Sequence, residues 1–200
     1  MYVWRTETRR KEPIKKHEFL GRPWANVAAD LYDLDKRTLF VISDYFSNYI
    51  EIACVQSWTT RSIIKELKAV FARFGIPDTL VTDNEPQFAS AEFAVFARAW
   101  EFDHVTSSPK YPQFNGKAEN AVKTAKSIFK KCKESGRSEF LALLDWHNTP
   151  TEGIGNGPAQ GIMERHCKTL LAIANSLLKP GYDTEVETCA LAGMKQRQKF

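Results

Sequence analysis

Three carboxylates stand at separated positions from which a fold could bring them together. Asp83 lies in Val81-Thr82-Asp83-Asn84, and thirty-five residues separate it from Glu119. Asp30 lies upstream in Ala29-Asp30-Leu31. Oxygen-only, anionic ligands suit Mg²⁺ or Mn²⁺, and two such ions about 3.5–4 Å apart can stabilise both the attacking and the leaving oxygen of a phosphodiester displacement. The spacing therefore predicts a two-metal phosphoryl-transfer site.

Basic residues are concentrated around the third of these acids. The 200-residue chain has a formal charge of only +4, yet residues 108–137 hold eight Lys or Arg and two Glu. Concentrated positive charge near acids favours an anionic substrate, most simply a nucleic-acid backbone that is steered to a metal site. The alternative is an ordinary solvated basic helix.

The elements that must position the acids begin with an antiparallel meander. Runs rich in Val, Ile, Phe and Tyr cover 24–34, 37–45 and 49–54. Asp35-Lys36 and Ser47-Asn48 separate them, as tight turns would. Asp30 is then interior to an apolar strand, where an unpaired carboxylate is costly unless a cation or hydrogen bonds compensate.

Strands and helices alternate after the meander. The pattern predicts a helix from Thr59 or Thr60 to residue 74, a strand over 79–82, a helix over 90–100 and a strand over 102–106. This order predicts an α/β fold: a five-stranded mixed sheet, antiparallel and then parallel, flanked by helices. Ligands of parallel strands gather at their carboxyl ends, where Asp83 falls.

A long helix is expected to carry the third acid. Asn115 can cap it, and Glu119, Lys123, Lys126 and Lys130 share one face beside an apolar stripe. The stripe consists of Ala118, Ala121, Val122, Ala125, Phe129 and Cys132. The structural alternative for the acid is an ion pair with Lys123, worth about 0.2–0.5 kcal/mol. Further helices are expected over 138–147 and 164–178.

Other acids and histidines compete for the chemical role. Asp33 and Asp35 lie toward a turn and are expected at the surface, while Asp44, at the end of a strand, is expected to cap or pair structurally. His104 and His147 could act as general bases, but two-metal chemistry needs none, so we interpret both as structural.

The chain divides into a charged leader or linker over 1–22, a globular domain over 23–165, and a helical segment with a tail over 166–200. The four cysteines form no Cys-x-x-Cys pair, which favours free thiols in a reducing compartment. Neither a secretory h-region nor a run of eighteen apolar residues occurs, so we expect an intracellular protein without a membrane partner.

Several motifs occur in one order along the chain. They are Arg22-Pro23-Trp24, Asp30-Leu31, Val41-Ile42-Ser43-Asp44-Tyr45-Phe46-Ser47, Phe71-Ala72-Arg73-Phe74-Gly75-Ile76-Pro77, Thr82-Asp83-Asn84-Glu85-Pro86-Gln87-Phe88, Thr106-Ser107-Ser108-Pro109-Lys110-Tyr111-Pro112-Gln113 and Asn115-Gly116-Lys117-Ala118-Glu119. Together they resemble the integrase catalytic core of retroviruses and gypsy-type LTR retrotransposons, over roughly residues 22–165.

The resemblance implies a ribonuclease H-like fold in which Asp30, Asp83 and Glu119 bind two Mg²⁺ (or Mn²⁺) ions. The implied activity is metal-dependent DNA end processing and strand transfer. The implied partners are element-end DNA, a target duplex and further copies of the chain in a homo-oligomer. Such work would place the protein in the nucleus.

The resemblance also assigns DNA contacts. Asn115, Lys123 and Lys126 match positions that contact the DNA end, a role that comes from the resemblance alone. Lys117 and Lys130, from the same basic segment, complete the expected DNA-binding set.

Departures from the family pattern leave two alternatives open. Glu85 stands where the family usually has Gly, so we expect backbone strain, increased by Pro86, and repulsion of DNA phosphate. Phe114 replaces a small polar residue, and the family's flanking zinc-binding and DNA-binding domains are not recognisable in these residues. The alternatives are a catalytically degenerate DNA-binding or interaction module, and a ribonuclease H-like nuclease.

Overall fold

Three antiparallel strands open the fold in the computed structural model, which describes residues 21–106, 116–150 and 155–181. They are β1 (Asn26–Leu34), β2 (Arg37–Asp44) and β3 (Ile50–Val55), and they form the expected meander. Asp35 and Lys36 both have positive φ, which suits the tight hairpin between β1 and β2. Trp24 also has a positive φ of 62°, so β1 begins at Asn26 rather than at residue 24.

The second half of the sheet is parallel. Its elements are α1 (Thr60–Phe74), β4 (Thr79–Thr82), α2 (Ala91–Ala99) and β5 (Asp103–Thr106). Side-chain oxygens of Thr59 and Ser90 cap the two helices by accepting hydrogen bonds from backbone N–H groups. The strand order is β3-β2-β1-β4-β5, with β4 parallel to both of its neighbours. The five-stranded mixed sheet is therefore confirmed.

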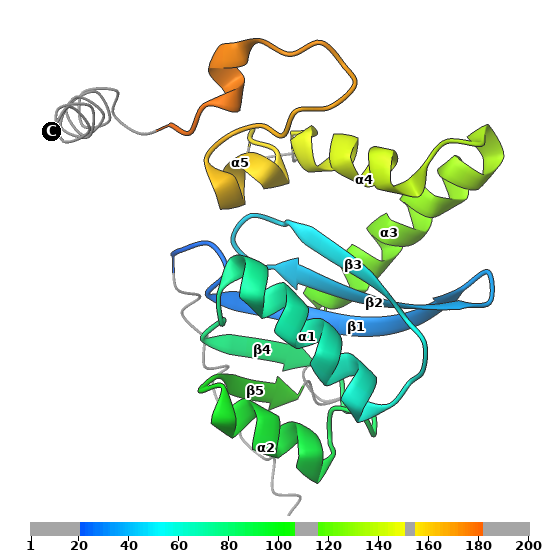
Figure 1. Cartoon of the computed structure of the whole chain (residues 1–200), viewed down its shortest axis with the longest axis vertical. Helices are drawn as coiled ribbons and strands as arrows, with labels where there is room; N and C mark the ends of the chain where they lie inside the picture. Colours follow the sequence, from blue (N-terminus) through cyan, green and yellow to red (C-terminus); the bar gives the residue numbers. More distant parts are fainter. Residues whose placement is uncertain (1–20, 107–115, 151–154, 182–200) are drawn as a thin grey trace, which may run out of the picture.

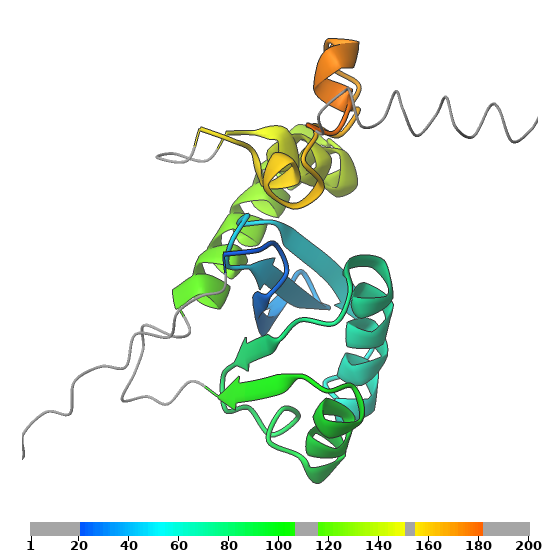
Figure 2. The same ribbon diagram turned by 90° about the vertical axis from the view of Figure 1, so that its left-hand side faces the viewer.

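Helices cover both faces of the sheet. Figures 1 and 2 show α1 and α2 on one face, while α3 (Gly116–Ser135) lies on the other and leads into α4 (Glu139–Asn148). Val27, Ala29 and Leu31 of β1 belong to the core cluster under α1 and α2, whereas Tyr32 belongs to the cluster under α3. Because strand side chains alternate, Asp30 is on the α3 side of the sheet.

The segment after α4 differs from the sequence-based expectation. The helix expected over 164–178 is wrong, because the only helix in that stretch is a short 3-10 helix, Asn175–Leu178. A helix that the periodicity did not indicate, α5 (Pro158–Met163), precedes it and ends where Glu164 turns left-handed at φ 57°. Leu170 and Leu171 are 80% and 66% exposed, so they have no core against which a helix could pack.

Within the described ranges, no helix is both long and apolar enough to cross a lipid bilayer. Cys54, Cys132 and Cys167 are free thiols, as expected, while Cys189 lies outside the described residues. Asn115, Phe114 and the greater part of the leader and tail also lie outside them.

Candidate active site

Asp30 and Asp83 stand at the same level of neighbouring parallel strands. β1 and β4 pair with Ala28 opposite Val81, and each acid follows its paired residue by two positions. Because side chains two residues apart along a strand point to the same face, both carboxylates share the face of Ala28 and Val81. Asp30 is interior to β1 and Asp83 comes directly after β4, and both are partly buried.

The first turn of α3 brings Glu119 to that same face. Ala118, only 1% exposed, forms a small apolar cluster with Ala28 and Val81. Alanine leaves room for the helix to lie close to the sheet. Glu119 is the next residue and is exposed. The three acids therefore gather at one corner, where α3 meets β1 and β4.

The electrostatics of Asp30 report on both other acids. The pKa of Asp30 is raised to about 6, chiefly by burial and also by the charges of Asp83 and Glu119, while a hydrogen bond from Leu31 N–H and the charge of Lys126 oppose the shift. The Leu31 N–H donates to Asp30 Oδ1 at 2.8 Å. Burial also raises the pKa of Asp83. A partly buried acid whose charge is disfavoured by two neighbouring acids is a fitting place for a cation.

Carboxylate oxygens are ligands that suit Mg²⁺ or Mn²⁺, but the three acids do not lie close enough together to coordinate one ion. Among the residues that the structure describes, no three His, Cys, Asp or Glu side chains form a group that could hold a metal ion. Glu119 extends from the exposed side of its turn. Closer approach of three carboxylates costs repulsion that a bound cation would remove.

Glu85 is a fourth acid at this corner. Burial raises the pKa of Glu85 to about 7, with further contributions from the charges of Asp83 and Asp30. Its backbone N–H donates to Asp83 Oδ1 at 3.2 Å. The expected backbone strain is wrong, since Glu85 is not among the described residues with positive φ. The departure at this position therefore acts through charge rather than through backbone geometry.

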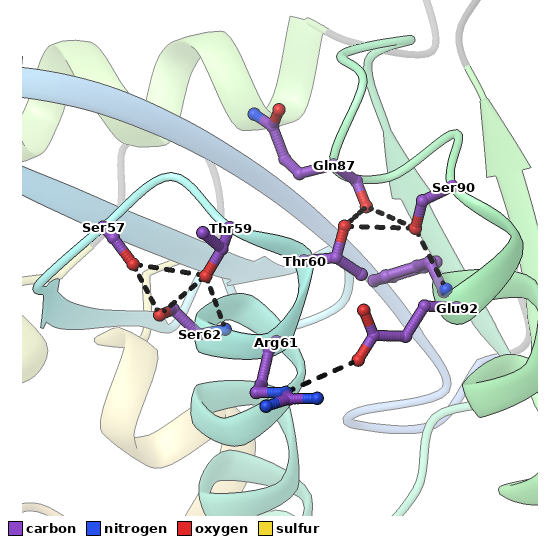
Figure 3. A network of polar contacts seen from close by, with 9 residues as sticks. Ser57, Thr59, Thr60, Arg61, Ser62, Gln87, Ser90 and Glu92 are labelled. Atoms are coloured by element: carbon purple, nitrogen blue, oxygen red, sulfur yellow. Dashed lines mark hydrogen bonds and ion pairs between the residues drawn. The ribbon is translucent and has the colours of Figure 1, made fainter.

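The segment that carries Glu85 is held by a polar network that the sequence did not indicate. Gln87 is buried, and its Nε2 donates to Glu85 Oε2. The carbonyl of Gln87 accepts from Thr60 Oγ1 at 3.0 Å and from Ser90 Oγ at 3.3 Å, at the start of two helices (Figure 3). Figure 3 shows the Gln87 amide extending away from this network. The residue types alone did not indicate that Gln87 would be buried.

The basic residues divide into two groups. Lys123, Lys126 and Lys130 are exposed on α3, at helical spacing from Glu119, and the Nζ of Lys126 lies 5.1 Å from the centre of the Tyr32 ring. Among the described ion pairs, none joins Glu119 to Lys123, so the structural alternative for that acid is not seen. Lys117 instead turns toward the loop after β2, and Asn115 lies outside the described residues.

The competing residues have structural roles, as expected. Asp44 is fully buried and accepts from Trp24 N–H, Ser47 N–H and Ser47 O–H. His147 is buried, and its Nε2 donates to Ile50 O at 2.9 Å.

At the surface, Asp33 accepts from Thr38, and Asp35 pairs with Lys133. His104 Nε2 lies 2.9 Å from Thr82 Oγ1, and its ring packs against Phe93.

Known proteins match this chain over its central part. Residues 22–112 match the family model described as integrase core domain, a range that includes Asp30 and Asp83 and ends before Glu119. An uncharacterized protein of Caenorhabditis elegans is 30% identical over 157 residues, which are 76% of this chain and 12% of that protein. The Gag-Pro-Pol polyprotein of sheep pulmonary adenomatosis virus is 35% identical over 127 residues, which are 58% of this chain and 7% of the polyprotein. The chain thus spans a small part of these relatives.

Solved structures share the fold. A chain of the simian T-cell lymphotropic virus intasome matches with a TM-score of 0.64 and 21% identity, over 77% of this chain and 58% of that chain. The HTLV-2 integrase catalytic core domain in complex with magnesium (trimeric form) matches with a TM-score of 0.59 and 22% identity, over 70% of this chain and 97% of that chain. Family model, relatives and fold agree: residues 22–112 of this chain match the integrase core domain, and the chain has the ribonuclease H-like fold of retroviral integrase cores.

Proposed function

We propose that this chain is a metal-dependent polynucleotidyl transferase of the integrase type, which processes DNA ends and joins them to a target duplex. The register of β1 and β4 carries the proposal, because Asp30 and Asp83 each follow one member of the pair Ala28 and Val81. The packing of α3 on that pair adds Glu119 to the same corner. Three acids from two strands and one helix match the donor set that two-metal phosphoryl transfer needs.

In this proposal Asp30, Asp83 and Glu119 hold two divalent ions, Mg²⁺ or Mn²⁺. When bound, such ions activate the attacking oxygen and stabilise the leaving oxygen of the phosphodiester. The chain positions the ions through a strand interior and a strand end, which are rigid supports. Lys123, Lys126 and Lys130 would bind DNA phosphates along α3.

The partners and the location follow from the same proposal. The matching HTLV-2 core structures are described as trimeric and dimeric forms, and the simian virus structure as an intasome, which supports a homo-oligomer that works on DNA ends. Element DNA and a chromosomal target would place the active protein in the nucleus.

The test combines activity with metal binding. Wild-type chain is expected to nick or join a short DNA duplex with Mg²⁺ or Mn²⁺, while Glu119→Gln falls to background. Glu134→Gln, at an exposed acid further along α3, is the matched control and should keep wild-type activity. Undiminished activity in Glu119→Gln would contradict the role of that acid. An RNA–DNA hybrid of the same sequence serves as a second substrate, since cleavage of the hybrid alone would indicate a ribonuclease H-like nuclease.

A catalytically degenerate DNA-binding or interaction module is the second candidate, and Glu85 favours it. An additional carboxylate beside Asp83 adds negative charge where a DNA phosphate must approach. Calorimetric titration with Mg²⁺ separates the candidates. If neither wild type nor Glu85→Gly binds Mg²⁺, Glu85 alone does not account for inactivity, and the module is the better assignment.

A further inference from the structure

Lys117 contacts the turn between β2 and β3 and does not lie with the exposed lysines of α3. Its Nζ donates to Asn48 Oδ1 and lies 3.5 Å from the carbonyl oxygen of Tyr45. The same Nζ lies 5.8 Å from the centre of the Tyr45 ring. Lys117 is partly buried, while Lys123 on the same helix is exposed. The ammonium group of Lys117 is therefore bound by residues of the β2–β3 turn, residues 45–49, and is less exposed to water than the exposed lysines of α3.

The β2–β3 turn is a firm support for such a contact. The buried carboxylate of Asp44 accepts from Ser47 N–H at 2.8 Å, Ser47 O–H at 2.6 Å and Trp24 N–H at 3.0 Å. From the other side α5 packs so closely that a Cβ on Gly161 would lie 2.7 Å from Ser47 Cβ. Asn48 has a φ of 63°, a conformation that asparagine adopts more readily than most residues. The acceptor on Asn48 is therefore held in place by the surrounding turn.

Lys117 and Glu119 belong to the same turn of α3, on either side of Ala118. Ala118 fixes how closely this turn approaches β1 and β4, but its small side chain cannot fix the rotation of the helix about its axis. A second contact, at a distance from the first, fixes that rotation. Burial lowers the pKa of Lys117, while the charge of Asp44 opposes this shift.

We propose that Lys117 is a positioning residue, which ties the first turn of α3 to the β2–β3 turn and so directs Glu119 toward Asp30 and Asp83. This assignment rests on the proposed metal site and replaces the DNA contact expected for Lys117 from the sequence. The position of Glu119 is less constrained by its surroundings than those of Asp30 and Asp83, because Glu119 is exposed at the beginning of its helix. Because the tether already restricts this turn of α3, less conformational entropy would be lost when a metal binds.

The test removes each end of the tether. Lys117→Met keeps the alkyl chain without the donor, and Asn48→Gly removes the acceptor while tolerating the positive φ. Each variant should weaken Mg²⁺ binding about fivefold in calorimetry, and the double variant should weaken it no further than the stronger single variant. Asn48→Asp keeps an acceptor oxygen and should retain wild-type affinity. Lys131→Met, at an exposed lysine of α3, is the matched control.

Two further measurements separate the tether from a DNA contact and from the metal proposal itself. Hydrogen exchange over residues 116–126 should quicken in Lys117→Met and stay unchanged in Lys131→Met. The slope of log K for DNA against log salt should be unchanged in Lys117→Met, whereas a lost phosphate contact reduces it by about 0.9, as expected for Lys123→Met.

Unchanged exchange together with a reduced slope in Lys117→Met would overturn the proposal and restore the DNA contact. If the wild-type chain binds no Mg²⁺ at all, the proposed function fails, while hydrogen exchange still decides whether the tether exists.

Discussion

Binding of Mg²⁺ should release protons from this chain, and their number measures whether Glu85 belongs to the site. The pKa of Asp30 is raised to about 6 and that of Glu85 to about 7, chiefly by burial and then by neighbouring acids. A bound cation favours the charged form of every carboxylate near it. The metal-free chain therefore holds protons that the metal-bound chain does not.

The magnitude follows from the two pKa values. At pH 6.5 a group of pKa 6 is about one-quarter protonated and a group of pKa 7 about three-quarters protonated, so binding should release about one proton. Both pKa values lie above the ordinary values of 3.8 and 4.5, so metal affinity falls as pH falls through 7 and then through 6. Between pH 9 and pH 5 the loss is about 10³-fold for wild type and about tenfold for Glu85→Gly, in which only Asp30 competes.

Calorimetry in two buffers of different ionisation enthalpy at pH 6.5 counts the protons directly. We expect about one proton for wild type and about a quarter of a proton for Glu85→Gly. Glu134→Gln, which alters an acid far along α3, should behave as wild type. Equal release from wild type and Glu85→Gly would show that Glu85 is not part of the site. Release near zero from both would refute the raised pKa of Asp30 as well.

Three other predictions concern the packing of α3 on the sheet, the DNA contact of Lys126 and the burial of His147. Ala118→Leu should lower the free energy of unfolding in urea by about 1–3 kcal/mol and weaken Mg²⁺ binding, because Ala118 is only 1% exposed and a larger side chain would push α3 away from the sheet. Wild-type stability and wild-type affinity together would contradict this close packing. Lys126→Ala should reduce the salt slope of DNA binding by about 0.9 in fluorescence anisotropy, whereas Lys65→Ala, at an exposed lysine of α1, should leave it unchanged. Burial lowers the pKa of His147 to about 4, so below pH 6.5 the unfolded chain binds a proton that the folded chain excludes. Wild type should therefore lose up to about 3 kcal/mol relative to His147→Gln between pH 6.5 and pH 4, and a difference that does not change with pH would refute this reasoning.

Local chemistry made much of the fold predictable. Thr59 and Ser90 are side-chain caps, and the limits of α1, β4 and α2 follow from them and from the turn residues between. The prediction failed over 164–178, where apolar residues such as Leu170 stay exposed. Whether such a segment becomes a helix depends on a partner surface, which local pattern does not reveal.

The same distinction applies to the site. The strand period predicted which face Asp30 would share with its neighbours, while the register that sets Asp30 and Asp83 at the same level of β1 and β4 is known only from the structure. The orientation of Lys117 was not predictable, because its partner Asn48 is 69 residues away in the sequence and belongs to a turn whose shape depends on buried Asp44. A lysine near a basic helix face favours a DNA contact on sequence alone, and tertiary contacts alter that interpretation.

If the proposed metal site is correct, Glu85 would alter the pH range over which the site binds metal rather than prevent binding. Without metal, protonation of Glu85 and the hydrogen bond from Gln87 Nε2 limit its repulsion by Asp83 and Asp30, so the fold tolerates the additional carboxylate. A bound cation would favour the ionised form of Glu85, whose negative charge would strengthen cation binding above pH 7. A DNA phosphate that approached the metal-free corner would meet Asp30, Asp83 and Glu85 together, whereas bound cations would neutralise that charge. We therefore expect this chain to bind its metal before DNA and to depend more steeply on pH than the Glu85→Gly variant does.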